Sequence, residues 1–249
     1  MVNVKDQVAI ITGGARGIGE AAAEKLACLG MKTVIFDVNT EAAHHVASRL
    51  KTNGLESMAI KADVTKREEV QDAVKQTMDR FGRIDVLVNN AGWSETRSFV
   101  DEDETYWDKV ISVNLKGPIL LSSAVLPFMI ERAYGKIVNI ASDAARTGNA
   151  GHTVYSAAKG GVISFTKSLA REVARYYINV NCVCPGVVDT TLLKEVPKEH
   201  IQALTRNIPF RRMGKPSEIA DAIAFLCSKE SDYITGQVLS VSGGLTMAG

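Results

Sequence analysis

Short apolar runs alternate with amphipathic stretches from one end of the chain to the other. The runs are apolar on both faces, which is typical of strands buried in a parallel sheet. The stretches between them repeat apolar positions every three to four residues, as helices do. Strands are predicted at 8–12, 33–37, 57–62, 86–89, 136–141, 178–184 and 237–241. Helices are predicted at 17–29, 40–52, 65–81, 103–113, 119–132, 153–175 and 217–228.

This alternation predicts a single α/β domain over residues 1–249. The expected architecture is a doubly wound (Rossmann) fold, with a seven-stranded parallel sheet and helices on both faces. Pro118 suits the first turn of its helix, and Pro127 is expected to kink that helix. The one irregular stretch, at 189–216, holds three prolines and follows the end of a strand, so we interpret it as a substrate lid.

Composition and charge argue against a nucleic-acid-binding, membrane-spanning or metal-binding protein. The formal net charge of +1 gives no field that would attract nucleic acid or a membrane surface. No apolar stretch approaches the roughly 20 residues that a membrane span needs, and the first residues lack the layout of a signal peptide. A cytoplasmic protein is therefore expected. Neither the cysteines nor the histidines have metal-ligand spacing, so no metal is predicted, and Cys182 and Cys184 are expected to be small buried side chains on one strand face.

A glycine-rich turn between the first strand and the first helix predicts a dinucleotide site. Gly13, Gly17 and Gly19 would let the backbone approach a pyrophosphate at a helix N-terminus. Asp37 ends the second strand, where a carboxylate accepts hydrogen bonds from a ribose and repels a 2′-phosphate. Arg16 is a conflicting signal, because a cation in this turn can meet a 2′-phosphate. On balance the sequence predicts NAD rather than NADP.

A second constellation predicts proton chemistry. Tyr155 and Lys159 are four residues apart at the start of a long helix, so their side chains share one face. Ser142 follows the fifth strand, at the edge of the sheet where ligands bind, and Asn114 follows a helix. Oxidation of an alcohol needs a base, and a nearby ammonium together with a cationic nicotinamide is expected to lower the pKa of a tyrosine toward neutrality. Lys159 can also bind the nicotinamide ribose, Ser142 can bind the substrate oxygen, and Asn114 can hold a water that links Lys159 to solvent.

These motifs together resemble the short-chain dehydrogenases/reductases over nearly the whole chain. The matching segments are Thr12–Gly19, Asp63, Asn89–Gly92, Asn114, Ser142, Tyr155, Lys159 and Pro185–Thr190. The resemblance implies an Asn-Ser-Tyr-Lys catalytic tetrad, adenine contacts at Asp63 and Val64, and nicotinamide contacts at Pro185 to Val188 and at Thr190. It also implies a homotetramer, whose close helix packing Gly160 and Gly161 would permit. One departure is Ser242, where the family usually has Asp.

The motifs and the resemblance together give a set of predicted cofactor-binding residues: Gly13, Arg16, Gly17, Ile18, Gly19, Asp37, Asp63, Val64, Asn90, Ala91, Gly92, Tyr155, Lys159, Pro185, Gly186, Val188 and Thr190.

A narrower resemblance, to 2-hydroxycyclohexanecarboxyl-CoA dehydrogenases and other alicyclic alcohol dehydrogenases, rests on the segments 139–146, 183–186 and 237–247 and on Trp93. It implies a cyclic secondary alcohol as the small-molecule substrate, with cyclohexanol close in chemistry. The predicted substrate-pocket residues are Trp93, Asp143, Thr147, His152, Val187 and Leu192.

Two alternatives stay open. A 3-oxoacyl-[acyl-carrier-protein] reductase has the same scaffold, but two positions that are basic in such reductases are Ala133 and Tyr176 here, and Asp37 disfavours the NADPH that they prefer. A non-catalytic NAD-binding protein would not need the tetrad that this chain retains.

Overall fold

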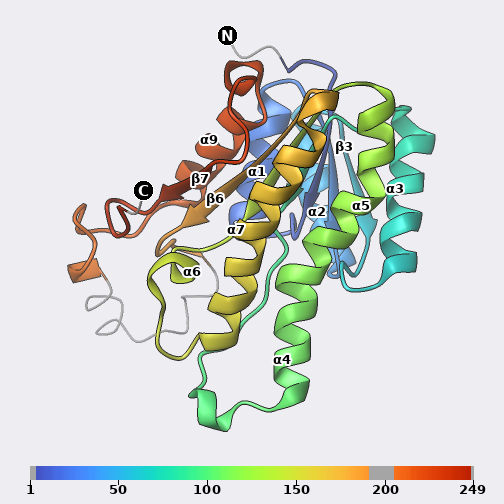
Figure 1. The fold of residues 1–249 in the computed structure, drawn as a ribbon. Helices are drawn as coiled ribbons and strands as arrows, with labels where there is room; N and C mark the ends of the chain where they lie inside the picture. The colour runs from blue at the N-terminus through green and yellow to red at the C-terminus, as the bar shows by residue number, and fades with distance from the viewer. Residues whose placement is uncertain (1–3, 191–204, 248–249) are drawn as a thin grey trace.

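The structure is a computed structural model that describes residues 4–190 and 205–247, and its fold is shown in Figure 1. Seven strands of the described residues form one parallel sheet in the order β3-β2-β1-β4-β5-β6-β7. Their bounds are β1 Val8–Thr12, β2 Lys32–Asp37, β3 Ser57–Lys61, β4 Val86–Asn89, β5 Gly135–Ile140, β6 Ile178–Pro185 and β7 Val238–Val241. The predicted Rossmann architecture is confirmed.

Helices cover both faces of the sheet (Figure 1). The helices are α1 Gly17–Cys28, α2 Thr40–Thr52, α3 Arg67–Phe81, α4 Glu104–Ile111, α5 Gly117–Glu131, α6 Ala144–Thr147, α7 Thr153–Val173 and α9 Pro216–Leu226. One core cluster joins the sheet to α1, α2 and α9 through side chains such as Leu26, Leu50 and Ile223. The opposite cluster joins it to α3, α5 and α7 through Val74, Leu121 and Leu169.

The strand order places the site. β1 lies between β2 and β4, so the direction in which the sheet is built reverses between β1 and β4. Loops leaving the carboxyl ends of these two strands turn away from one another, and ligands bind in the crevice that this creates. The glycine-rich turn after β1 and the loop after β4 are therefore expected to line the candidate site.

The prediction of two separate helices at 103–113 and 119–132 is wrong. The structure has one continuous helical stretch, Glu104–Glu131, that passes through Pro118 and Pro127. A π-turn, η2 (Ser112–Lys116), joins α4 to α5. Such wide turns insert an extra residue into a helix and are frequent at functional sites. The stretch is long and apolar enough to cross a membrane, but 44% of its most apolar window is buried inside the protein, as in a core helix.

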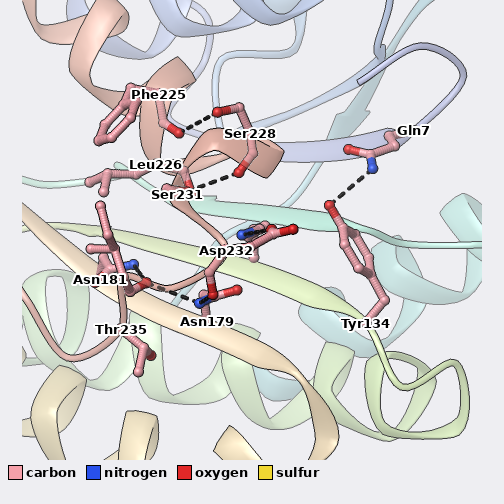
Figure 2. Close-up of polar contacts among 12 residues, drawn as sticks. Gln7, Tyr134, Asn179, Asn181, Phe225, Leu226, Ser228, Ser231, Asp232 and Thr235 are labelled. Carbon is pink, nitrogen blue, oxygen red and sulfur yellow. Dashed lines mark hydrogen bonds and ion pairs between the residues drawn. The ribbon is translucent and has the colours of Figure 1, made fainter. Parts of the chain in front are cut away.

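Polar side chains hold the loop that leads from α9 to β7, at the amino end of the sheet (Figure 2). The Asn179 amide donates to the carbonyls of Asp232 and Ile234 at 2.9 and 3.0 Å, and Asn181 donates to Ile234 at 2.8 Å. The Lys136 ammonium, only 1% exposed, pairs with Asp232 at 2.6 Å. This pair closes the end of the sheet opposite the candidate site.

Removing Asp232 is expected to destabilise the fold, because it leaves the buried Lys136 ammonium without its partner. We expect Asp232→Ala to lower the free energy of unfolding by about 2 kcal/mol in a denaturant titration. The loss stays below that of a fully buried pair because the Asp232 side chain is 58% exposed. Asp79→Ala breaks the exposed pair with Lys75 and serves as the control. Equal losses in the two variants would contradict this role of the buried ammonium.

Candidate active site

The turn after β1 is shaped by glycines whose missing side chains leave room for neighbouring backbone. Gly13 and Gly17 have positive φ angles of 62° and 58°, which side-chain-bearing residues rarely adopt. A Cβ on Gly19 would lie 2.2 Å from the Gly13 carbonyl oxygen and 2.5 Å from Asn90 Nδ2. No side chain caps the N-terminus of α1, so its first amides stay available to an anion. The turn thus fits a pyrophosphate.

The loop after β4 is bound directly to this turn. The Thr12 hydroxyl accepts hydrogen bonds from the backbone amides of Asn90 and Ala91, both at 3.0 Å. The side-chain amide of Asn90 donates through Nδ2 to the carbonyls of Thr12 and Gly13, at 2.9 and 3.1 Å. The structure therefore brings together two motifs that the sequence predicts at one site.

Asp37 presents its carboxylate beside the turn. Oδ2 accepts from the Ala15 amide at 3.1 Å, and Oδ1 accepts from the Asn39 amide at 2.9 Å. Two backbone donors fix the carboxylate and leave lone pairs for further donors. Arg16, at the N-cap of α1, is exposed.

At the adenine end of the predicted site, the side chains of Asp63 and Val64 have different environments. Asp63 Oδ1 accepts hydrogen bonds from the amide and the hydroxyl of Thr65, at 2.9 and 2.7 Å. Val64 is buried against Gly117, where an added Cβ would lie 2.9 Å from a Val64 methyl. The loop after β3 is thereby packed on the start of α5.

Tyr155 and Lys159 lie on α7, facing the end of β5. The Lys159 ammonium is buried and donates to the Ile140 carbonyl at 2.7 Å, and it lies 5.8 Å from the centre of the Tyr155 ring. Ser142 Oγ accepts a hydrogen bond from the Ala144 amide at 3.2 Å, and its hydroxyl donates to Tyr155. The structure thus brings together three of the four predicted catalytic residues around one phenol.

Asn114 lies in the π-turn, and its amide is already in use. Nδ2 donates to the carbonyls of Trp93 and Val110 at 2.6 and 2.9 Å, and Oδ1 accepts from the Trp93 amide at 3.3 Å. Both amide hydrogens are thus occupied, so the side chain can hold a water only through a lone pair of Oδ1. An added Cβ on Gly92 would lie 3.0 Å from Asn114 Oδ1 and 3.6 Å from the Lys159 ammonium. Asn114 therefore borders Lys159 and fixes the backbone that leads to Trp93.

Burial dominates the acid–base properties of the pair. It raises the pKa of Tyr155 above its ordinary value, although the Ser142 hydrogen bond acts in the opposite direction. It also lowers the pKa of Lys159 to about 8. In the protein without a cofactor, burial therefore outweighs the ammonium in setting the pKa of Tyr155. The predicted lowering of that pKa also needs the second cation, the oxidised nicotinamide, and it stays a prediction.

The nicotinamide loop after β6 is packed on the C-terminal segment. The Gly186 amide donates to the Val241 carbonyl at 3.1 Å, and a Cβ on Gly186 would lie 2.8 Å from that of Ser242. Ser242 Oγ accepts from the Thr246 amide at 3.2 Å, so the residue that departs from the family pattern still holds this turn. Val188 is buried, and Thr190 lies beside Gly17.

The predicted substrate residues separate into two groups. Trp93 and Tyr155 pack against the same buried cluster, and His152 meets the Tyr155 ring edge-on at 5.8 Å between centroids. The Asp143 carboxylate instead points to β7, where Oδ1 accepts from the Ser240 hydroxyl at 2.7 Å. Ser240 thus fixes the orientation of this buried carboxylate, and its place in the substrate pocket stays a prediction.

The other predicted pocket residues are Thr147, Val187 and Leu192. Thr147 is exposed, and its hydroxyl donates to the Asp143 carbonyl at 3.2 Å. The Val187 carbonyl accepts from the Gly214 amide at 2.9 Å, which ties the nicotinamide loop to the end of the predicted lid. Leu192 and half of the predicted lid, residues 191–204, lie outside the described residues.

Sequence reasoning missed the support behind Trp93. The Tyr106 ring packs against Trp93 at 5.6 Å between centroids, and the Lys109 ammonium lies 3.6 Å from the centre of the Trp93 ring. The Tyr106 hydroxyl donates to the Glu95 carbonyl at 2.8 Å. The helical spacing of Tyr106 and Val110 predicts a buried face but not that this face supports a site wall.

The buried cysteines follow the prediction. Cys182 and Cys184 share one buried cluster with Ala141 and Val162 beneath Lys159. Among the described residues, no three His, Cys, Asp or Glu side chains lie close enough together to hold a metal ion.

Comparisons with known proteins identify the family of the chain. Residues 13–246 match a family model described as Enoyl-(Acyl carrier protein) reductase. The (2S)-[(R)-hydroxy(phenyl)methyl]succinyl-CoA dehydrogenase subunit BbsD of Thauera aromatica is 41% identical, over 99% of each chain. The 3-oxoacyl-[acyl-carrier-protein] reductase FabG of Vibrio cholerae is also 41% identical, over 99% of this chain and 100% of its own.

A solved structure, the crystal structure of gox2181, superposes with a TM-score of 0.93 at 33% identity, over 97% of this chain and 96% of its own. The narrower resemblance to alicyclic alcohol dehydrogenases is not confirmed by these relatives. The matches span almost the whole chain. The chain belongs to the short-chain dehydrogenase/reductase family, and it is an oxidoreductase of hydroxyl or keto groups that uses a nicotinamide dinucleotide.

Proposed function

We propose that this protein is an NAD-dependent dehydrogenase that oxidises a secondary alcohol on or beside a ring to the ketone. Candidate substrates are cyclohexanol and 2-hydroxycyclohexanecarboxyl-CoA-like thioesters. The observation that carries the proposal is the supported Trp93 side chain in the same cluster as Tyr155, because an aromatic wall beside the base suits a flat apolar substrate. The relative from Thauera aromatica has a name that places a secondary alcohol beside a phenyl ring, which supports this choice.

The catalytic residues divide the reaction between them. The Tyr155 oxygen takes the hydroxyl proton of the substrate, and the Ser142 hydroxyl donates to the same substrate oxygen and holds it. Lys159, fixed by Ile140, holds the nicotinamide ribose and stabilises the phenolate. The nicotinamide accepts the hydride when it is bound. Asn114 keeps the Trp93 backbone in place beside them.

A direct assay tests this function. Purified protein is mixed with NAD and a panel of alicyclic alcohols and hydroxyacyl-CoA thioesters, and formation of NADH is followed by absorbance. Turnover of ring-bearing alcohols with NAD is the expected result. Turnover confined to 3-oxoacyl carrier-protein substrates with NADPH would favour the reductase alternative, and binding of NAD without any turnover would favour a non-catalytic role.

The reductase alternative draws on one observation, the 41% identity to a 3-oxoacyl-[acyl-carrier-protein] reductase. Two features count against it here. The positions at which such reductases are basic are Ala133 and Tyr176, so a negatively charged carrier would lose two partners. Asp37 presents a carboxylate where the 2′-phosphate of NADPH would lie.

The choice of NAD predicts the behaviour of Asp37→Ala. We expect the ratio of kcat/KM with NAD to that with NADP to fall by about 10- to 100-fold, because the ribose loses an acceptor and the 2′-phosphate loses a repulsion of about 1–4 kcal/mol. Steady-state kinetics with both cofactors measures the ratio. Asp72→Ala removes an exposed carboxylate on α3 and is the control. An unchanged ratio in the Asp37 variant would remove the basis for NAD.

We also propose a cytoplasmic homotetramer. The α5 helix is apolar around most of its circumference, and a helix of this kind is normally covered on all sides. Ile111 and Ile119 are exposed on the long helical stretch, and Leu239 and Phe225 are exposed on β7 and α9 at the edge of the sheet. Two uncovered apolar faces support two kinds of contact between copies. Light scattering of the purified protein is expected to give four times the mass of one chain, and the mass of a single chain would contradict the proposal.

A further inference from the structure

His152 is the polar side chain that the proposed mechanism does not use, and it touches the base. It is the N-cap residue of α7, one turn before Tyr155. The two rings meet in a T-shaped arrangement with centroids 5.8 Å apart and an angle of 70° between their planes. The His152 side chain is partly exposed, so one side of the imidazole faces the base and another stays open to a ligand.

Asn149 is the polar neighbour of the His152 ring. Asn149 Nδ2 lies 3.4 Å from His152 Nδ1. When the Asn149 amide donates in this contact, Nδ1 accepts and the neutral ring carries its proton on Nε2. The imidazole therefore offers an N–H donor on the side away from Asn149.

The backbone around His152 is held in place before any substrate binds. The His152 amide donates to the Asn149 carbonyl at 3.1 Å, and the His152 carbonyl accepts from the Ser156 amide at 2.8 Å. The Gly151 carbonyl accepts from the Arg97 amide at 3.1 Å, and a Cβ on Gly151 would lie 2.8 Å from a Thr96 methyl. The loop before α7 is thus fixed on the segment that follows Trp93, which makes the histidine a prepositioned donor.

The other donors at Tyr155 are already assigned. In the proposed reaction Ser142 turns its single hydroxyl hydrogen from the tyrosine oxygen to the reacting oxygen of the substrate. Lys159 is buried and donates to the Ile140 carbonyl. Among the described residues around Tyr155, the partly exposed His152 can donate to a second polar group of the substrate.

We propose that the His152 Nε2–H group donates to the oxygen of a carbonyl group that is attached to the carbon next to the carbinol carbon. The preferred substrates are then β-hydroxycarbonyl compounds, such as esters or thioesters of 2-hydroxycyclic acids. This inference rests on the proposed function and selects one of the substrate classes that it contains. A simple alcohol such as cyclohexanol reacts at Tyr155 but leaves the histidine without its acceptor. A site built to hydrogen-bond a substrate group disfavours the analogue that lacks it.

A comparison of two probes tests the role of His152. The probes are ethyl 2-hydroxycyclohexanecarboxylate and cyclohexanol, assayed with saturating NAD. We expect His152→Ala to lower kcat/KM for the ester about tenfold, the loss of one hydrogen bond, and to change that for cyclohexanol less than about twofold. His152→Gln keeps an N–H donor and is expected to restore most of the loss. His44→Ala removes an exposed histidine on α2 and is the control.

The outcomes distinguish failure of the His152 inference from failure of the proposed function. Equal losses for the ester and cyclohexanol would show that His152 acts only by packing on Tyr155, and no loss for either would remove its role; both results overturn the inference and leave the proposed function intact. If the wild-type protein oxidises neither these probes nor the corresponding CoA thioester, the proposed function fails and the inference fails with it. The glutamine variant retains the cap position, so it keeps the test decisive if the alanine variant folds poorly.

Discussion

Replacing Tyr155 with phenylalanine is expected to lower kcat by about 10³- to 10⁴-fold, because it removes the group that takes the substrate proton while leaving the ring in its cluster. The affinity for NAD, measured by fluorescence titration, should change little. The midpoint of thermal unfolding should also stay within a few degrees of the wild type, since only one oxygen is lost. Loss of turnover with retained folding and cofactor binding is the signature of an acid/base residue.

A tyrosine away from the site provides the control. Tyr177 is 77% exposed, so Tyr177→Phe should keep the wild-type kcat. A Tyr155 variant that loses NAD binding or unfolds would point to a structural role instead.

Lys159→Met is expected to lower kcat by at least about 10²-fold and to raise the KM for NAD, because the variant lacks the ammonium beside the phenol and the ribose. Although Lys159→Met lowers activity, it is expected to raise the stability of the fold below pH 8. Burial lowers the pKa of Lys159 to about 8 from an ordinary value of 10.5, so the folded protein binds fewer protons than the unfolded chain between these two pH values. Wild-type stability should therefore rise with pH through this window.

The size of this rise follows from the pKa shift. Below pH 8 we expect the free energy of unfolding of the wild type to carry a penalty of about 3 kcal/mol from the buried ammonium, which the methionine variant lacks. Between pH 8 and pH 10.5 the wild type is expected to regain this free energy of unfolding relative to the variant. Denaturant titrations of both proteins across this range measure it. Parallel stability curves would contradict the claim that the ammonium is held in the interior at a cost in stability.

Much of the site could be predicted from local sequence because the relevant geometry is local or repeats with the fold. Tyr155 and Lys159 share a face by helical spacing alone, and Ser142 follows a strand whose carboxyl end must lie at the ligand edge of the sheet. The glycine turn and Asp37 are placed in the same way. The strand bounds differ from their predicted values by one residue at most.

Other features depend on contacts that no spacing contains. The merger of two predicted helices through the π-turn at Asn114 depends on how that turn packs on Trp93 and Gly92. The orientation of Asp143 depends on Ser240, which is 97 residues away in the chain. The cost of burying Tyr155 and Lys159, which sets their pKa values in the protein without a cofactor, is visible only in three dimensions.

The central claim is that the Tyr155 phenolate forms in the complex with the oxidised cofactor and is the base of the reaction. The most direct test is an absorbance titration of tyrosinate in the wild type and in Tyr155→Phe, each with and without NAD. The account predicts that the titration assigned to Tyr155 by difference lies above the ordinary tyrosine range in the free protein and moves to lower pH when NAD binds. A Tyr155 titration that stays at the same pH with and without NAD would contradict it.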